Sequence, residues 1–180
     1  RVAILGGGDA KMLHEVLKYP TVQKVVHMEL DQKNTRKSFK FFGTEPHFDD
    51  DRIEWYFGDC AKTLRVLPSS YFGTFDLVFV DLSESGPLSF DVSENLTVWQ
   101  SIVQLLNPNG ILVKNELYGE VLKEMFDYSM MVYYENVPMI ESWALTFGTN
   151  RKDLLYPSKS SMKQWKELDF GKLLFCSYET

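Results

Sequence analysis

Residues 2–9 read VAILGGGD, and residues 10–20 continue as AKMLHEVLKYP. A short apolar run therefore leads directly into three glycines and an acid. The next apolar residues fall at helical spacing, at Met12, Leu13, Val16 and Leu17. This order predicts a strand, a glycine turn and a helix. Glycine allows a sharp bend and lets a ligand approach the main chain, and the first amides of a helix point toward the same place. We expect a ligand at this turn; a tight turn that binds nothing is the alternative interpretation.

The second expected strand, residues 24–29, ends in an acid. Glu29 stands about 20 residues after the glycines, which is the spacing at which a carboxylate accepts hydrogen bonds from a ribose in nucleotide-binding folds. Asp31 follows, and we expect it to cap a helix over residues 31–42. The pattern therefore indicates a nucleoside site.

Two later strands also end in acids. Residues 53–57 run into Gly58-Asp59-Cys60, and residues 75–81 read FDLVFVD. The second run is almost continuously apolar, which is typical of a central parallel strand covered on both faces. Ligands of open α/β sheets bind beyond the carboxyl ends of the strands. We therefore expect four carboxylates along one cleft: Asp9, Glu29, Asp59 and Asp81.

The remaining pattern predicts the fold class. Helices are expected over residues 61–67, from about 93 to 106, and over 118–130; strands are expected at 111–113, 131–137 and 143–147. A turn is expected at residues 107–110. Strand and helix thus alternate five times before two strands follow each other, an order similar to that of class I methyltransferases. We expect an α/β, Rossmann-like, doubly wound sheet that is mostly parallel with one antiparallel strand near the C-terminus.

The composition limits the classes of molecule that the protein is expected to bind. The 180 residues carry a net charge of −6, which argues against a nucleic-acid partner and is compatible with a cationic substrate. The only cysteines are Cys60 and Cys176, too few for a disulfide framework or a cysteine-rich metal site. Three successive aspartates at 49–51 indicate a solvated loop rather than a metal site. We therefore expect no metal, no membrane partner and a cytoplasmic protein.

Three spaced motifs carry a family resemblance. The glycine turn GGGD, the helix HEVLKYP at residues 14–20 and the strand VVHMELD at residues 25–31 resemble the spermidine and spermine synthases, the aminopropyltransferases. The resemblance extends from Arg1 to about residue 148. It implies one nucleoside-binding catalytic domain over residues 1–150, with residues 151–180 as a C-terminal extension packed on it. We expect the β-rich domain that precedes the catalytic domain in this family to be absent from this chain.

The resemblance also implies roles for the strand-end residues. Glu29 would hold the ribose, Asp59 the adenine, and Asp9 the aminopropyl ammonium of decarboxylated S-adenosylmethionine. A carboxylate at Asp9 also disfavours intact S-adenosylmethionine, whose own carboxylate would approach it. The expected nucleoside-binding residues are Gly6, Gly7, Gly8, Asp9, Glu29, Asp31, Asp59 and Cys60.

The implied reaction is the attack of a putrescine-class or spermidine-class amine on the methylene beside the sulfonium, which releases methylthioadenosine. Asp81 would take the amine proton or orient the amine while water takes it. The expected amine-binding residues are Asp81, Glu84 and Glu141. A homodimer fits the resemblance as well.

The sequence departs from the family pattern at three places. Ala10-Lys11 follows the acid where two small residues are usual, Glu84-Ser85 stands for Asp-Pro, and Lys114-Asn115-Glu116 occupies the region of the usual glutamine. Two alternatives therefore stay open. One is an S-adenosylmethionine-dependent methyltransferase on the same fold, and the other is a non-catalytic homologue that serves as a binding or assembly module.

Overall fold

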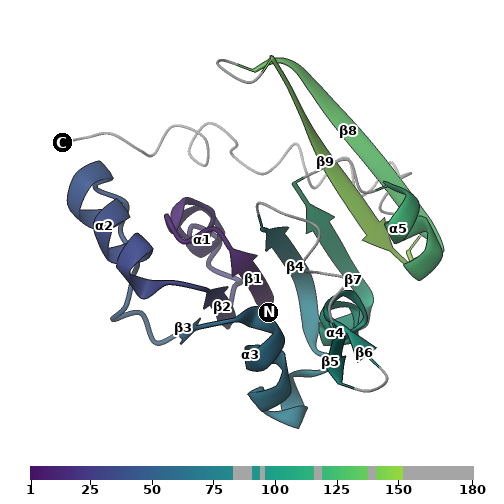
Figure 1. Ribbon diagram of the computed structural model, residues 1–180, viewed down its shortest axis with the longest axis horizontal. Coiled ribbons are helices and arrows are strands. Elements are labelled where there is room, and N and C mark those ends of the chain that lie inside the picture. Colours follow the sequence, from purple (N-terminus) through teal and green to yellow (C-terminus); the bar gives the residue numbers. More distant parts are fainter. Residues whose placement is uncertain (83–90, 94–95, 116–118, 138–140, 152–180) are drawn as a thin grey trace.

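The computed structural model describes residues 1–82, 91–93, 96–115, 119–137 and 141–151. Its centre is a seven-stranded sheet with the order β3-β2-β1-β4-β7-β9-β8 (Figure 1). The strands are β1 Val2–Gly6, β2 Val25–Glu29, β3 Ile53–Phe57, β4 Phe75–Asp81, β7 Leu106–Lys114, β8 Tyr128–Val137 and β9 Glu141–Thr149.

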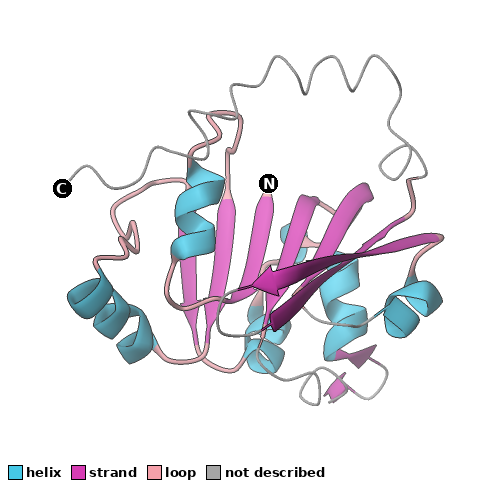
Figure 2. Cartoon of the chain, turned by 90° about the horizontal axis from the view of Figure 1, so that it is seen from above, coloured by secondary structure: helices cyan, strands magenta, loops and turns pink. Residues whose placement is uncertain are grey.

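The strand directions confirm the predicted fold class. β3, β2, β1, β4 and β7 pair in parallel, whereas β9 is antiparallel to both β7 and β8. One antiparallel strand near the C-terminus therefore interrupts an otherwise parallel sheet. Figure 2 shows these strands side by side, with helices around them.

Helices cover both faces of the sheet. They are α1 Lys11–Leu17, α2 Gln32–Phe42, α3 Cys60–Val66, α4 Val98–Leu105 and α5 Gly119–Met125. β1 alternates its side chains between two cores: Ala3 and Leu5 join the cluster that includes α3, α4 and α5, whereas Ile4 packs with α1. The sheet is thus doubly wound, as its nearly continuous apolar strands predict.

Local hydrogen bonds explain where the helices begin. The side chain of Asp31 accepts from the amide of Lys33 at the start of α2, and Asp59 accepts from the amide of Ala61 at the start of α3. Both acids therefore satisfy amides that have no partner within the helix. The predicted cap at Asp31 is confirmed.

Two helix boundaries differ from the sequence-based prediction. The helix expected from about residue 93 begins at Val98, because Thr97 and Gln100 form a reciprocal capping box there. A two-stranded sheet of β5 Asp91–Ser93 and β6 Leu96–Thr97 precedes it.

The helix expected to continue to residue 130 ends at Met125. Its last predicted turn belongs instead to β8, where Tyr128 pairs with Thr149 of β9. Pairing across the sheet outweighs the local helical pattern there. The turn predicted at residues 107–110 lies inside β7, where the pairing with β4 shifts register between Phe75 and Leu77.

Part of the domain prediction lies outside the described residues. Residues 152–180 belong to that part, so the packing of the C-terminal extension stays a prediction. Of the helices that the structure does describe, none has the length and apolar character needed to cross a membrane.

Candidate functional site

The glycine turn after β1 is held between two carboxylates. Gly6 and Gly7 have positive φ angles of 81° and 64°, a backbone conformation that favours glycine. A Cβ at Gly7 would lie 3.0 Å from Asp81 Oδ2, and a Cβ at Gly8 would lie 2.6 Å from the Glu29 carboxyl carbon. Two missing side chains therefore bring the main chain against the ends of β4 and β2.

Glu29 is partly buried at the end of β2. Its Oε1 accepts from the amide of Asp31 at 3.1 Å, and its main-chain oxygen accepts from the amide of Gly58 at 2.9 Å. The contact with Gly8 on one side and the bond from Asp31 on the other fix the position of this carboxylate. Asp31 itself uses its side chain as the cap of α2.

Asp9 closes the turn before α1. Its Oδ1 accepts from the amide of Lys11 at 3.1 Å, and the amide of Ala10 donates to the carbonyl of Gly7 at 3.0 Å. Ala10 adopts a left-handed conformation with φ 61°. The amide of Lys11, the first residue of α1, is thus satisfied by Asp9, and the Lys11 side chain is exposed.

Asp81 is half-buried at the end of β4, directly opposite Gly6. Burial raises its pKa above the ordinary value, the nearby Asp9 carboxylate raises it further, and Lys114 lowers it. The side-chain amide of Asn115 donates to Asp81 Oδ1. The carboxylate therefore has a raised proton affinity and a fixed neighbour, two properties of a general base.

Lys114 and Asn115 were not predicted as site residues; the sequence marked them only as a departure from the family pattern. Lys114 is fully buried at the end of β7, opposite Val80 of β4. A lysine that directly follows an apolar strand next to an acid-bearing strand was the available signal.

Asp59 and Cys60 follow β3, the edge strand that β2 separates from β1. Asp59 is exposed, and its side chain caps α3. Cys60 begins α3 and packs partly buried against the core, and burial raises the pKa of its thiol. The order of the strands places the acids along one edge of the sheet: Asp59, Glu29, Asp9 and Asp81.

The two other residues expected to bind the amine are Glu84 and Glu141. Glu84 lies outside the described residues. Glu141 opens β9 and pairs with Val137 at the far end of the long β8–β9 pair, beyond Thr146, which is the β9 residue opposite Lys114 (Figure 1). Both therefore stay predictions.

Buried His27 has a structural role, in line with its position inside a strand. Its Nε2 lies 2.7 Å from the carbonyl oxygen of Gly6, and its ring stacks on Trp55 with centroids 3.9 Å apart. Because a carbonyl only accepts, Nε2 carries the proton. Burial lowers the pKa of His27 to about 4. The neutral ring thus supports the glycine turn.

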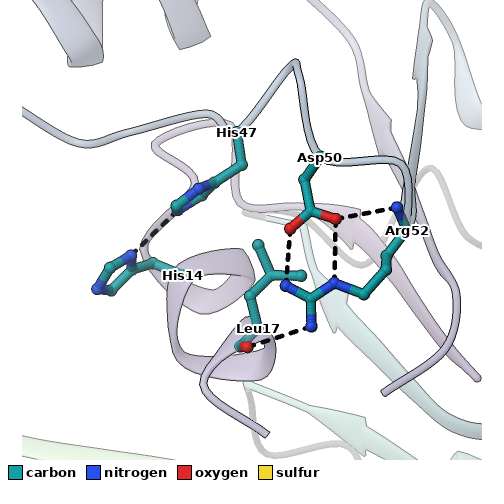
Figure 3. A network of polar contacts seen from close by, with 5 residues as sticks. All are labelled: His14, Leu17, His47, Asp50 and Arg52. Carbon is teal, nitrogen blue, oxygen red and sulfur yellow. Dashed lines mark hydrogen bonds and ion pairs between the residues drawn. The ribbon is translucent and has the colours of Figure 1, made fainter. Parts of the chain in front are cut away.

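The other two histidines form part of a separate network (Figure 3). His14 Nδ1 lies 3.1 Å from His47 Nε2, and Arg52 pairs with Asp50 at 2.7 Å while also donating to the carbonyl of Leu17. These contacts tie the loop before β3 to α1. Asp50, one of the three successive aspartates, is therefore engaged with Arg52, and within the described part of the chain no group of three potential ligands could hold a metal ion.

Comparison with known proteins identifies the family. The family model described as the spermine/spermidine synthase domain matches residues 1–160 of the 180. The chain belongs to this family. The resemblance of the three spaced motifs is thereby confirmed.

Curated proteins that are similar to the chain carry the name polyamine aminopropyltransferase. The chain is similar to the polyamine aminopropyltransferase of Thermoanaerobacter sp. (strain X514), with 29% identity over 84% of this chain and 58% of the relative. It is also similar to the enzyme of that name from Saccharolobus solfataricus, with 27% identity over 97% of this chain and 61% of the relative. The chain therefore spans a little over half the length of these relatives.

Solved structures support the fold. The spermidine synthase from Thermotoga maritima superposes with a TM-score of 0.68 at 22% identity, over 86% of this chain and 54% of that one. A spermidine synthase structure in complex with the transition-state analogue AdoDATO gives the same TM-score and identity.

Proposed function

We propose that this chain is the catalytic domain of an aminopropyltransferase, which transfers an aminopropyl group from decarboxylated S-adenosylmethionine to an amine of the putrescine or spermidine class. One observation carries the proposal: the carboxylates of Glu29 and Asp81 lie on either side of the Gly7-Gly8 turn, with Asp9 beside them. The names of the curated relatives and the AdoDATO complex of a spermidine synthase support it.

The negative charge at the carboxyl ends of the parallel strands would select the ligand. Carboxylates at Asp9, Glu29 and Asp81 attract a cationic nucleoside and a cationic amine, and they repel a pyrophosphate. Glu29 would hold the ribose hydroxyls, Asp59 the adenine, and Asp9 the ammonium of the aminopropyl group. Because intact S-adenosylmethionine brings its own carboxylate toward Asp9, the site would favour the decarboxylated form.

The chemistry requires little more than a base and good alignment. The acceptor nitrogen forms a bond to the methylene carbon, the bond from that carbon to sulfur breaks, and its electron pair leaves with neutral methylthioadenosine. Asp81 would accept the proton that the attacking nitrogen gives up, directly or through water. The sulfonium is already a good leaving group, so positioning contributes much of the remaining rate.

Ligand-dependent thermal stability tests the proposal. A ligand that binds only the folded state raises its melting temperature by mass action. Decarboxylated S-adenosylmethionine and methylthioadenosine should both stabilise the protein more than S-adenosylmethionine does, and mixing the decarboxylated form with putrescine or spermidine should release methylthioadenosine. A preference for intact S-adenosylmethionine would support a methyltransferase instead, and stabilisation by none of the three would support a non-catalytic homologue. The homodimer, the cytoplasmic location and the absence of a nucleic-acid partner stay predictions.

A further inference from the structure

A buried lysine lies beside the carboxylate of Asp81. Lys114 is 0% exposed, and its ammonium donates to the carbonyl oxygen of Leu82 at 3.0 Å and to Oδ1 of Asn115 at 2.7 Å. A buried charge is costly unless hydrogen bonds and an opposite charge compensate it. Asn115 bonds to both Lys114 and Asp81, so the Asp81 carboxylate provides the opposite charge.

Asn115 connects the two charged groups. A side-chain amide has an oxygen that accepts and a nitrogen that donates. An ammonium has only donors, so Lys114 requires the oxygen of Asn115. An ionised carboxylate has only acceptors, so Asp81 requires the nitrogen, which donates to its Oδ1. Each end of the amide thus has one suitable partner, and a flipped amide would place donor against donor and acceptor against acceptor.

Two charged groups act on Asp81 in the described structure. Asp9 acts on it from the turn after β1, and Lys114 acts on it from β7. Glu29 lies farther along, on the other side of Gly8. The like charge of Asp9 raises the pKa of Asp81, because two nearby carboxylates repel each other when both are ionised. A fixed cation beside them removes much of that repulsion.

We infer that Lys114 is a positioning residue that acts through Asn115 to hold Asp81 ionised and fixed in orientation. The effect of Lys114 on Asp81 does not depend on the reaction, whereas its catalytic consequence rests on the proposed aminopropyl transfer. With Lys114 in place, Asp9 and Asp81 can carry their charges together, so the site can bind two cationic groups at once. One is the aminopropyl ammonium and the other is the acceptor amine.

Direct titration of Asp81 tests this inference without any substrate. The carboxyl carbon of carbon-13-labelled aspartate reports protonation by NMR, and Asp81→Asn identifies the Asp81 signal. Lys114→Met removes the cation and keeps the length of the side chain. It should move the Asp81 midpoint upward by about one pH unit or more, the size expected for the loss of a nearby opposite charge.

Two further variants distinguish the loss of the Lys114–Asn115–Asp81 hydrogen bonds from a nonspecific effect of substitution. Asn115→Leu removes the bridge while keeping Lys114, and it should move the midpoint in the same direction by a smaller amount. Lys11→Met is the matched control, because the Lys11 side chain is an exposed cation at the start of α1. It should leave the Asp81 midpoint unchanged. Near-ultraviolet circular dichroism establishes that each variant is folded.

The outcomes distinguish this inference from the proposed function. If the Asp81 midpoint stays the same in both Lys114→Met and Asn115→Leu, Lys114 has no role in positioning Asp81. If the midpoint moves but the wild type transfers no aminopropyl group, the inference on Lys114 stands and the proposed function fails. If transfer occurs, Lys114→Met should move the acidic limb of kcat/KM to higher pH, whereas purely structural damage would lower kcat/KM equally across the pH range.

Discussion

Gly6 and Asp81 lie opposite each other in the parallel pairing of β1 and β4, and a Cβ at Gly6 would be 2.0 Å from the carbonyl oxygen of Asp81. The absence of a side chain at Gly6 therefore allows β1 and β4 to approach closely at their carboxyl ends. The glycine turn follows β1 at this point, and the proposed base ends β4. The positive φ of Gly6 places the following residues over the ends of β2 and β4.

Gly6→Ala should destabilise the fold strongly. The new methyl group would be strained at φ 81° and would also collide with the main chain of Asp81. We expect a loss of about 2–5 kcal/mol in the free energy of unfolding, from backbone strain and overpacking together. Gly43→Ala is the matched control, because Gly43 has φ 68° but a Cβ added there would meet nothing within 4 Å. It should lose only about 1–2 kcal/mol from strain, and equal losses in urea denaturation would contradict the close approach at Gly6.

Local patterns predicted most of the fold. The glycine turn, the apolar run of β4 and the Asp31 cap are signals carried by neighbouring residues, and the structure confirms all three. The predicted start of α4 was wrong because the reciprocal capping pair of Thr97 and Gln100 lies later in the chain. The end of α5 was wrong because β9 recruits Tyr128 into the sheet.

The hydrogen bonds that link Lys114, Asn115 and Asp81 could not be predicted from local patterns. Asn115 lies 34 residues away from Asp81, and Lys114 lies 32 residues from Leu82. Their contacts depend on the register that sets Val80 opposite Lys114. The sequence shows that both stretches end strands, but only the register shows which side chains meet.

Stability should fall on mild acidification because of His27. Its pKa is about 4 in the folded protein and about 6.5 in the unfolded chain. Because the folded pKa is depressed, the folded state is favoured fully above pH 6.5, where the ring is neutral in both states. This contribution is lost progressively as the pH falls from about 6.5 to 4, and it amounts to about 3 kcal/mol.

His27→Gln tests that contribution. The variant lacks the titrating ring, so its free energy of unfolding should change much less between pH 7 and about pH 4.5 than that of the wild type. His47→Gln is the control. The pKa of His47 is also lowered by burial, but His47 lies in a more exposed loop, so its effect should be smaller. An unchanged pH dependence in His27→Gln would show that the imidazole is not kept neutral.

Glu29→Ala should weaken nucleoside binding while the fold is kept. The loss of a hydrogen-bonded carboxylate costs about 1.5–3 kcal/mol, which is about tenfold to a hundredfold in affinity for methylthioadenosine. Glu15→Ala removes an acid of the same type whose partner is Lys18 on the surface of α1, and it should bind normally. Calorimetry that gives equal affinities for the two variants would remove Glu29 from the nucleoside site.

Asp81→Asn should separate chemistry from binding. The amide keeps the size of the side chain but has neither its charge nor its basicity, so turnover should fall by about a hundredfold or more, the usual contribution of a positioned base. Methylthioadenosine affinity should change far less, because the proposed binding mode places the ribose and adenine at other strand ends. The wild-type rate should decline as the pH falls through the pKa of Asp81, which burial and Asp9 raise above its ordinary range, and the variant should lack this limb.

Asp76→Asn provides the matched control for Asp81→Asn on the same strand. Asp76 lies near the other end of β4, where its Oδ1 accepts from the side-chain amide of Asn107 at 2.8 Å. It should keep normal turnover even if the fold loses a little stability. If Asp81→Asn also turns over normally, with decarboxylated S-adenosylmethionine and a saturating amine, Asp81 is not the base. Proton transfer to water would then have to be sufficient, with Asp81 only orienting the amine.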